Sequence, residues 1–129
     1  MRLVVGGYAQ GKLDCVLRNL HLSRADVART MDFRPGEKKV LYGLHELVAQ
    51  ALRDGLEPEP AVWTAVEQNP ELTIVCNELG CGVVPVDAFE RELRERVGRL
   101  CCALAVQAET VVRVFCGVPL VIKGAETWN

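Results

Sequence analysis

The stretch that decides the fold is Gly6-Gly7-Tyr8-Ala9-Gln10-Gly11-Lys12-Leu13. It follows a short apolar run, residues 2–5, that is typical of a buried strand, and it leads into apolar residues at helical spacing up to about Leu20. A glycine, four residues and then Gly-Lys, placed between a strand and a helix, is the spacing of a phosphate-binding P-loop.

This spacing has a chemical reason. Glycines let the backbone amides turn towards one point, the N-terminus of the helix adds partial positive charge there, and Lys12 would reach the outer phosphates of a nucleotide. The alternative is a tight strand-to-helix turn with an incidental lysine. We therefore predict that residues 6–13 bind phosphate and that Lys12 is a catalytic residue.

The P-loop motif is incomplete, because Leu13 stands where the motif has a Ser or Thr that holds Mg²⁺. The next expected strand, residues 40–44, also lacks an acidic residue at its tip to position the metal. Glu46 follows closely; it either substitutes for that carboxylate or favours the dipole of a helix that we predict from His45 to Asp54. The sequence thus leaves the use of Mg²⁺ open and predicts no metal site formed by the protein.

Strands and helices alternate along the rest of the chain. After Ser23 we expect a short helix or a short strand around Val27, and Asp87 is the expected N-cap, with Glu90 completing a capping box, of a helix that ends near residue 108. A further helix is expected over 60–68 and strands over 72–76, 111–116 and 120–123. This alternation favours a parallel sheet with right-handed crossovers. We predict an α/β fold, a P-loop NTPase-like three-layer sandwich with a mostly parallel sheet, in one nucleotide-binding domain over residues 1–129.

Composition limits the function. Of 129 residues, 50% are hydrophobic and 25% are charged, which is typical of a packed globular protein, and aromatic residues make up only 5%, so the core should be aliphatic. The net charge of −2 provides no strong field for nucleic acid or anionic lipid. No run of 18 apolar residues and no signal peptide is seen, so we expect a cytoplasmic protein without membrane contact. The six cysteines lack the C-x2-C spacing of zinc sites, and we expect reduced, mostly buried thiols.

A second motif occupies residues 73–85. An apolar strand delivers Asn77 and Glu78 to its carboxyl end, where α/β sheets place their ligands. Gly80 and Gly82 then allow the backbone to approach a ligand closely.

Together the two motifs resemble the adenosylcobinamide kinase / adenosylcobinamide-phosphate guanylyltransferase family of cobalamin biosynthesis. The family pattern N-E-x-G-x-G-x-V-P is matched at Asn77, Glu78, Gly80, Gly82, Val84 and Pro85. Its P-loop, G-G-x-x-S-G-K-S, is matched at Gly6, Gly7, Gly11 and Lys12. Its helical R-x3-G-R pattern is met by Arg94, Gly98 and Arg99, and its closing strand, glycine and I-K ending resemble residues 111–117 and 122–123.

The resemblance implies that ATP or GTP is bound and that a cobinamide-type molecule is the substrate. The family's first activity phosphorylates the hydroxyl of the aminopropanol arm, and its second transfers GMP onto that phosphate through a guanylylated histidine. On this basis Glu78 is a base or holds a water, with Asn77, Gly80 and Gly82 near the substrate. Arg94 and Arg99 either contact phosphate or lie on a solvated helix face. Related enzymes are oligomers, so a homo-oligomer is expected.

The chain also departs from the family. It is shorter, and the missing length lies between the P-loop helix and the strand at Val40, where the family carries its histidine nucleophile. Neither His21 nor His45 takes that place, and Trp63-Thr64-Ala65-Val66-Glu67, which superficially matches a W-x-T-x-E stretch, comes after the second strand instead of before it. We predict that guanylyl transfer is lost. Three hypotheses remain: a cobinamide kinase, a non-catalytic nucleotide-binding regulator or partner subunit, and a structural relic that binds only sulfate or phosphate.

Overall fold

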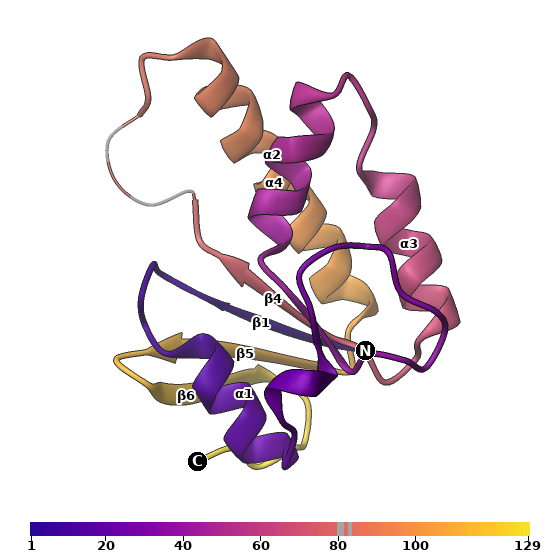
Figure 1. The fold of residues 1–129 in the computed structure, drawn as a ribbon. Coiled ribbons are helices and arrows are strands. Elements are labelled where there is room, and N and C mark those ends of the chain that lie inside the picture. Colours follow the sequence, from indigo (N-terminus) through magenta and orange to yellow (C-terminus); the bar gives the residue numbers. More distant parts are fainter. Residues whose placement is uncertain (80–81, 83) are drawn as a thin grey trace.

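The computed structural model describes residues 1–79, 82 and 84–129. These residues form a six-stranded sheet in the order β2-β3-β4-β1-β5-β6, together with four α-helices (Figure 1). The strands are β1 (Arg2–Gly6), β2 (Val27–Ala28), β3 (Val40–Tyr42), β4 (Thr73–Asn77), β5 (Thr110–Phe115) and β6 (Val118–Lys123). The helices are α1 (Lys12–Leu20), α2 (Leu44–Arg53), α3 (Glu59–Gln68) and α4 (Ala88–Gln107), and a 3₁₀ turn, η1 (Arg24–Asp26), precedes β2.

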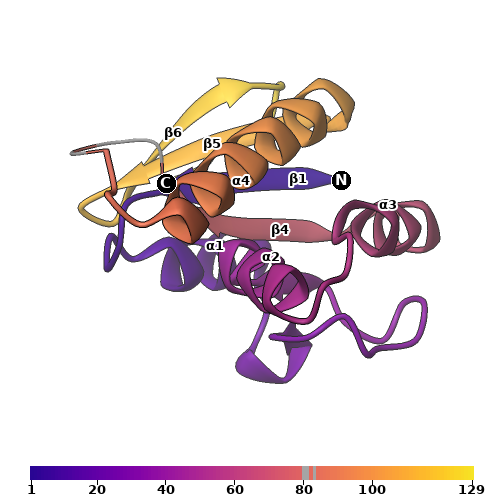
Figure 2. The same cartoon turned by 90° about the horizontal axis from the view of Figure 1, so that it is seen from above.

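The predicted fold class is confirmed. All strand pairs are parallel except β5–β6, which is an antiparallel hairpin. The helices form layers on both faces of the sheet, with α1 on one face and α2, α3 and α4 on the other (Figures 1 and 2). Because parallel strands end at the same edge of a sheet, the carboxyl ends of β1, β3 and β4 lie together, and Gly6 pairs directly with Asn77.

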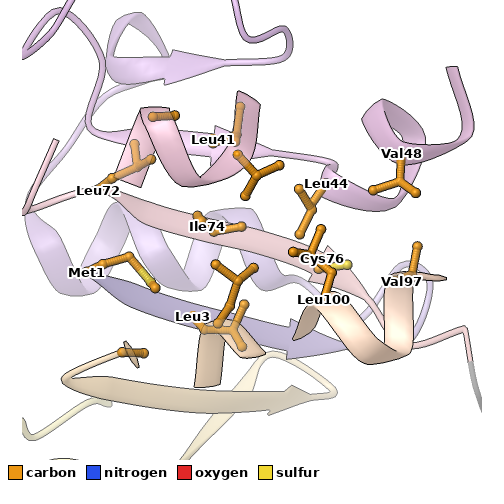
Figure 3. Packing of buried hydrophobic residues seen from close by; sticks show 14 of the residues in the cluster. Met1, Leu3, Leu41, Leu44, Val48, Leu72, Ile74, Cys76, Val97 and Leu100 are labelled. Atoms are coloured by element: carbon orange, nitrogen blue, oxygen red, sulfur yellow. The ribbon is translucent and has the colours of Figure 1, made fainter. Parts of the chain in front are cut away.

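Alternate strand residues supply the two cores. Leu3, Leu41 and Ile74 face the helices α2–α4, whereas the next residues along the same strands, Val4 and Val75, face α1. Figure 3 shows the larger core, in which side chains from β1, β3, β4, α2 and α4 meet. The core is aliphatic, as the low aromatic content predicts, and each fully buried Leu or Ile contributes about 1.5–3 kcal/mol to folding.

Most predicted elements are confirmed, with ends that differ from the prediction by at most two residues. Both alternatives after Ser23 occur, since η1 leads directly into β2. Asp87 caps α4 by accepting hydrogen bonds from the amides of Phe89 and Glu90. Within the described part of the chain, every helix is too short or too polar to cross a lipid bilayer.

The turn between β5 and β6 corrects one prediction. Cys116, expected inside a strand, lies in this turn with φ of 52°, and Gly117 follows with φ of 75°. Two successive residues with positive φ suit the twist of a two-residue hairpin, so the chain reverses here instead of extending. Cys116 is therefore exposed. It is a free thiol, as are the other described cysteines, Cys15, Cys76, Cys101 and Cys102.

Candidate functional site

The loop from β1 to α1 has a shape that its two motif glycines make possible. Gly6 ends β1, and a Cβ there would lie 2.5 Å from the carbonyl oxygen of Val114 on β5. Gly11, the N-cap of α1, has φ of 80°, and its Cβ would lie 3.3 Å from the Cα of Gly117. The loop is thus fixed by close backbone packing, independently of any ligand.

Gln10 ties this loop to the β5–β6 hairpin. Its side-chain Oε1 accepts a hydrogen bond of 2.7 Å from the amide of Cys116, and its carbonyl oxygen accepts one of 2.8 Å from the amide of Gly117. The local motif gives no sign of this role, because the partner residues lie more than 100 positions away along the chain. Sequence analysis placed Gln10 among the phosphate-binding residues 6–13, but it did not predict that Gln10 positions the loop against the hairpin.

Lys12 is buried at the start of α1, with 4% of its surface exposed. Its Nζ donates a hydrogen bond of 2.6 Å to the carbonyl oxygen of Gly7. Burial lowers the pKa of Lys12, and the charge of nearby Glu78 acts in the opposite direction. Because Gly11 has no side chain to cap α1, the first amides of the helix are open to an external acceptor. An ammonium group and helix amides therefore meet in one loop, which is a suitable arrangement for an anion.

Asn77 and Glu78 lie beside this loop, as their position at the end of β4 predicts. The amide of Glu78 donates to the carbonyl oxygen of Gly6 at 2.9 Å. Both carboxylate oxygens of Glu78 bind Arg113 on β5, at 2.9 and 3.1 Å. Glu78 is thus held in a bidentate ion pair, and Arg113 is a second member of the site that the sequence did not indicate.

A pocket of about 460 Å³ opens between α2 and α4. Its polar wall includes His45, Glu46 and Gln50 on α2 and Arg94 on α4, and its apolar wall includes Leu93. The Nδ1 atom of His45 accepts a 3.1 Å hydrogen bond from the amide of Asn77, so the hydrogen of the neutral ring is on Nε2. Burial lowers the pKa of His45, Glu46 opposes this shift, and the charge of Lys12 adds to it. Because Asn77 also pairs with Gly6, the His45 end of this pocket lies next to the start of the loop of residues 6–13.

A smaller pocket, of about 210 Å³, lies on the other side of the loop. Residues 9–14 form one wall, and Arg24, Arg29 and Tyr42 form the other. We call it the arginine pocket. Leu13, at the position of the motif's hydroxyl residue, and Tyr42, the last residue of β3, both line it.

The residues at this edge do not fit the Mg²⁺ site of a complete P-loop. Leu13 is aliphatic and buried, and Gly43, at the tip of β3, has no side chain. The carboxylate of Glu46 is exposed in the first turn of α2, 3.6 Å from Nε2 of His45. Among residues 1–79, 82 and 84–129, no group of three His, Cys, Asp or Glu side chains could hold a metal ion.

The remaining predicted site residues are dispersed. Arg94 lines the larger pocket and donates to the carbonyl oxygen of Gly82 at 3.3 Å. Arg99 pairs with Glu95 at 2.9 Å and borders a separate pocket beside Trp63 of α3, so the structure does not bring it to the loop of residues 6–13. Gly80 lies outside the described residues.

Comparison with known families supports the family resemblance found in the sequence. The family model described as cobinamide kinase / cobinamide phosphate guanyltransferase matches residues 44–122, which is more than half of the chain. The matched region runs from α2 into β6 and includes Asn77 and Glu78, but it does not include residues 6–13. No curated protein sequence is significantly similar to the chain.

Proposed function

Because the chain belongs to the cobinamide kinase / cobinamide phosphate guanyltransferase family, we propose that it binds ATP or GTP and phosphorylates a cobinamide-type alcohol. In this proposal residues 1–129 form one P-loop domain, and residues 6–13 hold the nucleotide phosphates. Guanylyl transfer is absent, since neither His21 nor His45 occupies the place of the family's nucleophile.

The course of residues 6–13 supports the proposal most strongly. Gly6 and Gly11 hold the loop in shape, and the buried ammonium of Lys12 bonds to the loop's own Gly7 carbonyl. An incoming phosphate oxygen would replace that carbonyl as the partner of Lys12, and a charge-assisted hydrogen bond to phosphate is the stronger of the two. The loop is thus prepared for an anion before binding.

The 460 Å³ pocket is the proposed site of the acceptor alcohol, because it has a polar wall and because His45 in that wall is joined through Asn77 to Gly6, where the loop of residues 6–13 begins. Nε2–H of His45 would donate to the acceptor's oxygen. In the transfer this oxygen forms a bond to the γ-phosphorus, the bond from that phosphorus to the β–γ bridging oxygen breaks, and the hydroxyl proton passes to water. We assign Glu78 to holding that water, because its ion pair with Arg113 keeps the carboxylate in place.

A second function is favoured by the two missing metal ligands at positions 13 and 43. Phosphoryl transfer depends on neutralising charge on the phosphates, and this edge offers Mg²⁺ no carboxylate or hydroxyl at either position. The second candidate is therefore a non-catalytic nucleotide-binding regulator or partner subunit.

Restoring the hydroxyl at position 13 distinguishes the two functions. Leu13→Ser and its control Leu13→Ala remove the same apolar bulk, but only the serine can hold a metal. Phosphorylation of cobinamide by ATP or GTP is measured with and without Mg²⁺, beside nucleotide affinity. A kinase predicts measurable turnover in the wild type that rises in Leu13→Ser and not in Leu13→Ala. Nucleotide binding without turnover in any variant would instead support the non-catalytic subunit.

Self-association remains a prediction. The β5–β6 hairpin at the edge of the sheet exposes Phe115, Val118, Leu120 and Ile122, and a group of exposed apolar side chains favours contact with another protein surface. Sedimentation velocity over a range of concentrations would measure the oligomeric state.

A further inference from the structure

Leu13, one of the two metal-ligand positions of the P-loop motif, lines the arginine pocket, together with Tyr42, which precedes the other position, Gly43. We infer that this chain binds phosphates without a metal, and that Arg29 supplies the positive charge that Mg²⁺ supplies in a complete P-loop. This inference rests on the proposed nucleotide binding and names the residue that replaces the metal.

The position of Arg29 follows from the sheet. It is the residue after β2, which pairs in parallel with β3, so it lies at the same edge as the tip of β3. Its guanidinium carbon lies 4.5 Å from the centre of the Tyr42 ring. A cation–π contact of this kind restricts the side chain without neutralising its charge. The Tyr42 ring therefore keeps the charged guanidinium of Arg29 next to the position where P-loop enzymes place an acidic residue.

The arginine pocket connects this charge to the P-loop. Arg29 and Tyr42 face Gln10, Gly11 and Leu13 across a space of about 210 Å³, which exceeds the volume of several water molecules and accommodates a phosphate group. The Leu13 side chain has no oxygen that could bind a metal ion in this pocket. The guanidinium of Arg29 needs no such ligand, because it belongs to the protein itself. The wall of the arginine pocket, where outer phosphates would bind, thus carries the positive charge of Arg29.

The balance of charges in the pocket favours an anion. Four charged residues line it: Lys12, Asp14, Arg24 and Arg29. Arg24 lies 3.3 Å from Asp14, so these two charges largely offset each other. Lys12 and Arg29 remain, one from each wall. A polyphosphate between them would bind Lys12 as a point charge and Arg29 through two parallel hydrogen bonds.

Free polyphosphate should therefore bind better than its magnesium complex. Mg²⁺ neutralises part of the ligand's charge, and the described residues at this edge give the metal nothing in return. Added Mg²⁺ thus weakens binding, in contrast to a complete P-loop. Because Arg29 is exposed, salt also weakens the interaction.

The test uses inorganic tripolyphosphate as the probe, with affinities measured by calorimetry in EDTA and in Mg²⁺ at low and moderate salt. Arg29→Gln should lose about tenfold in affinity and Arg29→Lys less, because lysine keeps the charge but not the bidentate fork. The matched control is Arg34→Gln, which removes an exposed arginine from the 33–37 turn and should stay within about twofold of the wild type. Circular dichroism confirms that each variant is folded.

Two sets of results would overturn different claims. If the wild type binds and Lys12→Met does not, but Arg29→Gln behaves like Arg34→Gln, or if Mg²⁺ strengthens binding, the role of Arg29 is refuted and the P-loop stands. If the wild type fails to bind tripolyphosphate and nucleotide, or if Lys12→Met binds equally well, the proposed nucleotide binding fails, and the inference fails with it.

Discussion

The tips of β1 and β3 use the same backbone device for different chemistry. Each strand passes through a left-handed glycine into a helix: Gly11, with φ of 80°, precedes α1, and Gly43, with φ of 84°, precedes α2. At the β1 tip the next residue is the buried cation Lys12, whereas at the β3 tip Leu44 enters the core. The comparison teaches that both tips share a strand–glycine–helix backbone, but only the β1 tip places a buried cation at the start of its helix.

The two tips also differ in how tightly they are packed. A Cβ at Gly6 or Gly11 would meet backbone atoms of neighbouring segments, whereas a Cβ at Gly43 would meet only the side chain of Glu46, at 3.7 Å. The β1 tip is therefore sterically fixed, and the β3 tip has room for a side chain. Substitutions at the two tips should have correspondingly different effects.

The largest effect is expected from Gly6→Ala. The new methyl group would lie 2.5 Å from the carbonyl oxygen of Val114, which belongs to the sheet and cannot move away without breaking strand pairing. We expect a loss of about 3 kcal/mol in the free energy of unfolding, measured with urea. The control is Gly98→Ala in α4, where the Cβ meets nothing within 4 Å; it should stabilise the protein by about 0.5–1 kcal/mol. Equal stability of the two variants would refute the close packing of the β1 tip.

Lys12→Met tests whether the buried ammonium group at the β1 tip binds anions. Removing the buried ammonium should lower tripolyphosphate affinity by about 10–100-fold, the worth of a hydrogen bond to a charged group. The same change should raise stability at neutral pH. Because burial lowers the pKa of Lys12 in the folded protein, its charged form opposes folding, and this cost disappears as the pH rises through the lowered pKa towards the ordinary value of about 10.5.

Urea titrations at several pH values measure this effect. Between the lowered pKa and about 10.5, the wild type should gain stability relative to Lys12→Met as the pH rises. A variant that loses both affinity and stability at neutral pH would show that Lys12 is mainly a structural residue.

Gly43→Asp, made together with Leu13→Ser, tests whether a carboxylate and a hydroxyl at these two positions create a Mg²⁺ site. The positive φ of Gly43 strains any side chain by about 1 kcal/mol, and Asp and Asn tolerate it best. With a carboxylate and a hydroxyl restored, Mg²⁺ should change from weakening tripolyphosphate binding to strengthening it several-fold. The control, Gly43→Asn with Leu13→Ser, has the same shape without the charge. If both double variants respond alike to Mg²⁺, the missing carboxylate does not explain the difference between the tips.

The sequence predicts the β1 tip far better than its surroundings, for a physical reason. The glycine spacing, the strand and the helix are local, and so are Asn77 and Glu78 at the end of β4. Contacts between distant segments are not encoded in any short motif: Gln10 with the hairpin at Cys116, Glu78 with Arg113, and Arg29 with Tyr42. The side of α4 to which Arg99 points also depends on how α3 packs, so a family pattern could not place it. These partners are therefore identified only when the strands are assembled into the sheet.

The smallest effect is expected at His45, a polar residue in the first turn of α2, directly after the β3 tip. Its Nδ1 accepts the Asn77 amide, so protonation would break that bond, and burial holds its pKa below the ordinary value of about 6.5. The unfolded chain then binds the proton more readily, and the free energy of unfolding should decline as the pH falls from about 6.5 through the lowered pKa. His45→Asn keeps an acceptor for the amide and cannot titrate, so its decline should be shallower. His21→Asn, at the end of α1, should retain the wild-type slope. If the slope is unchanged in His45→Asn, protonation of His45 does not control its hydrogen bond to Asn77. The β3 tip then adds no titrating group to the edge of the sheet at which Lys12 supplies a charge.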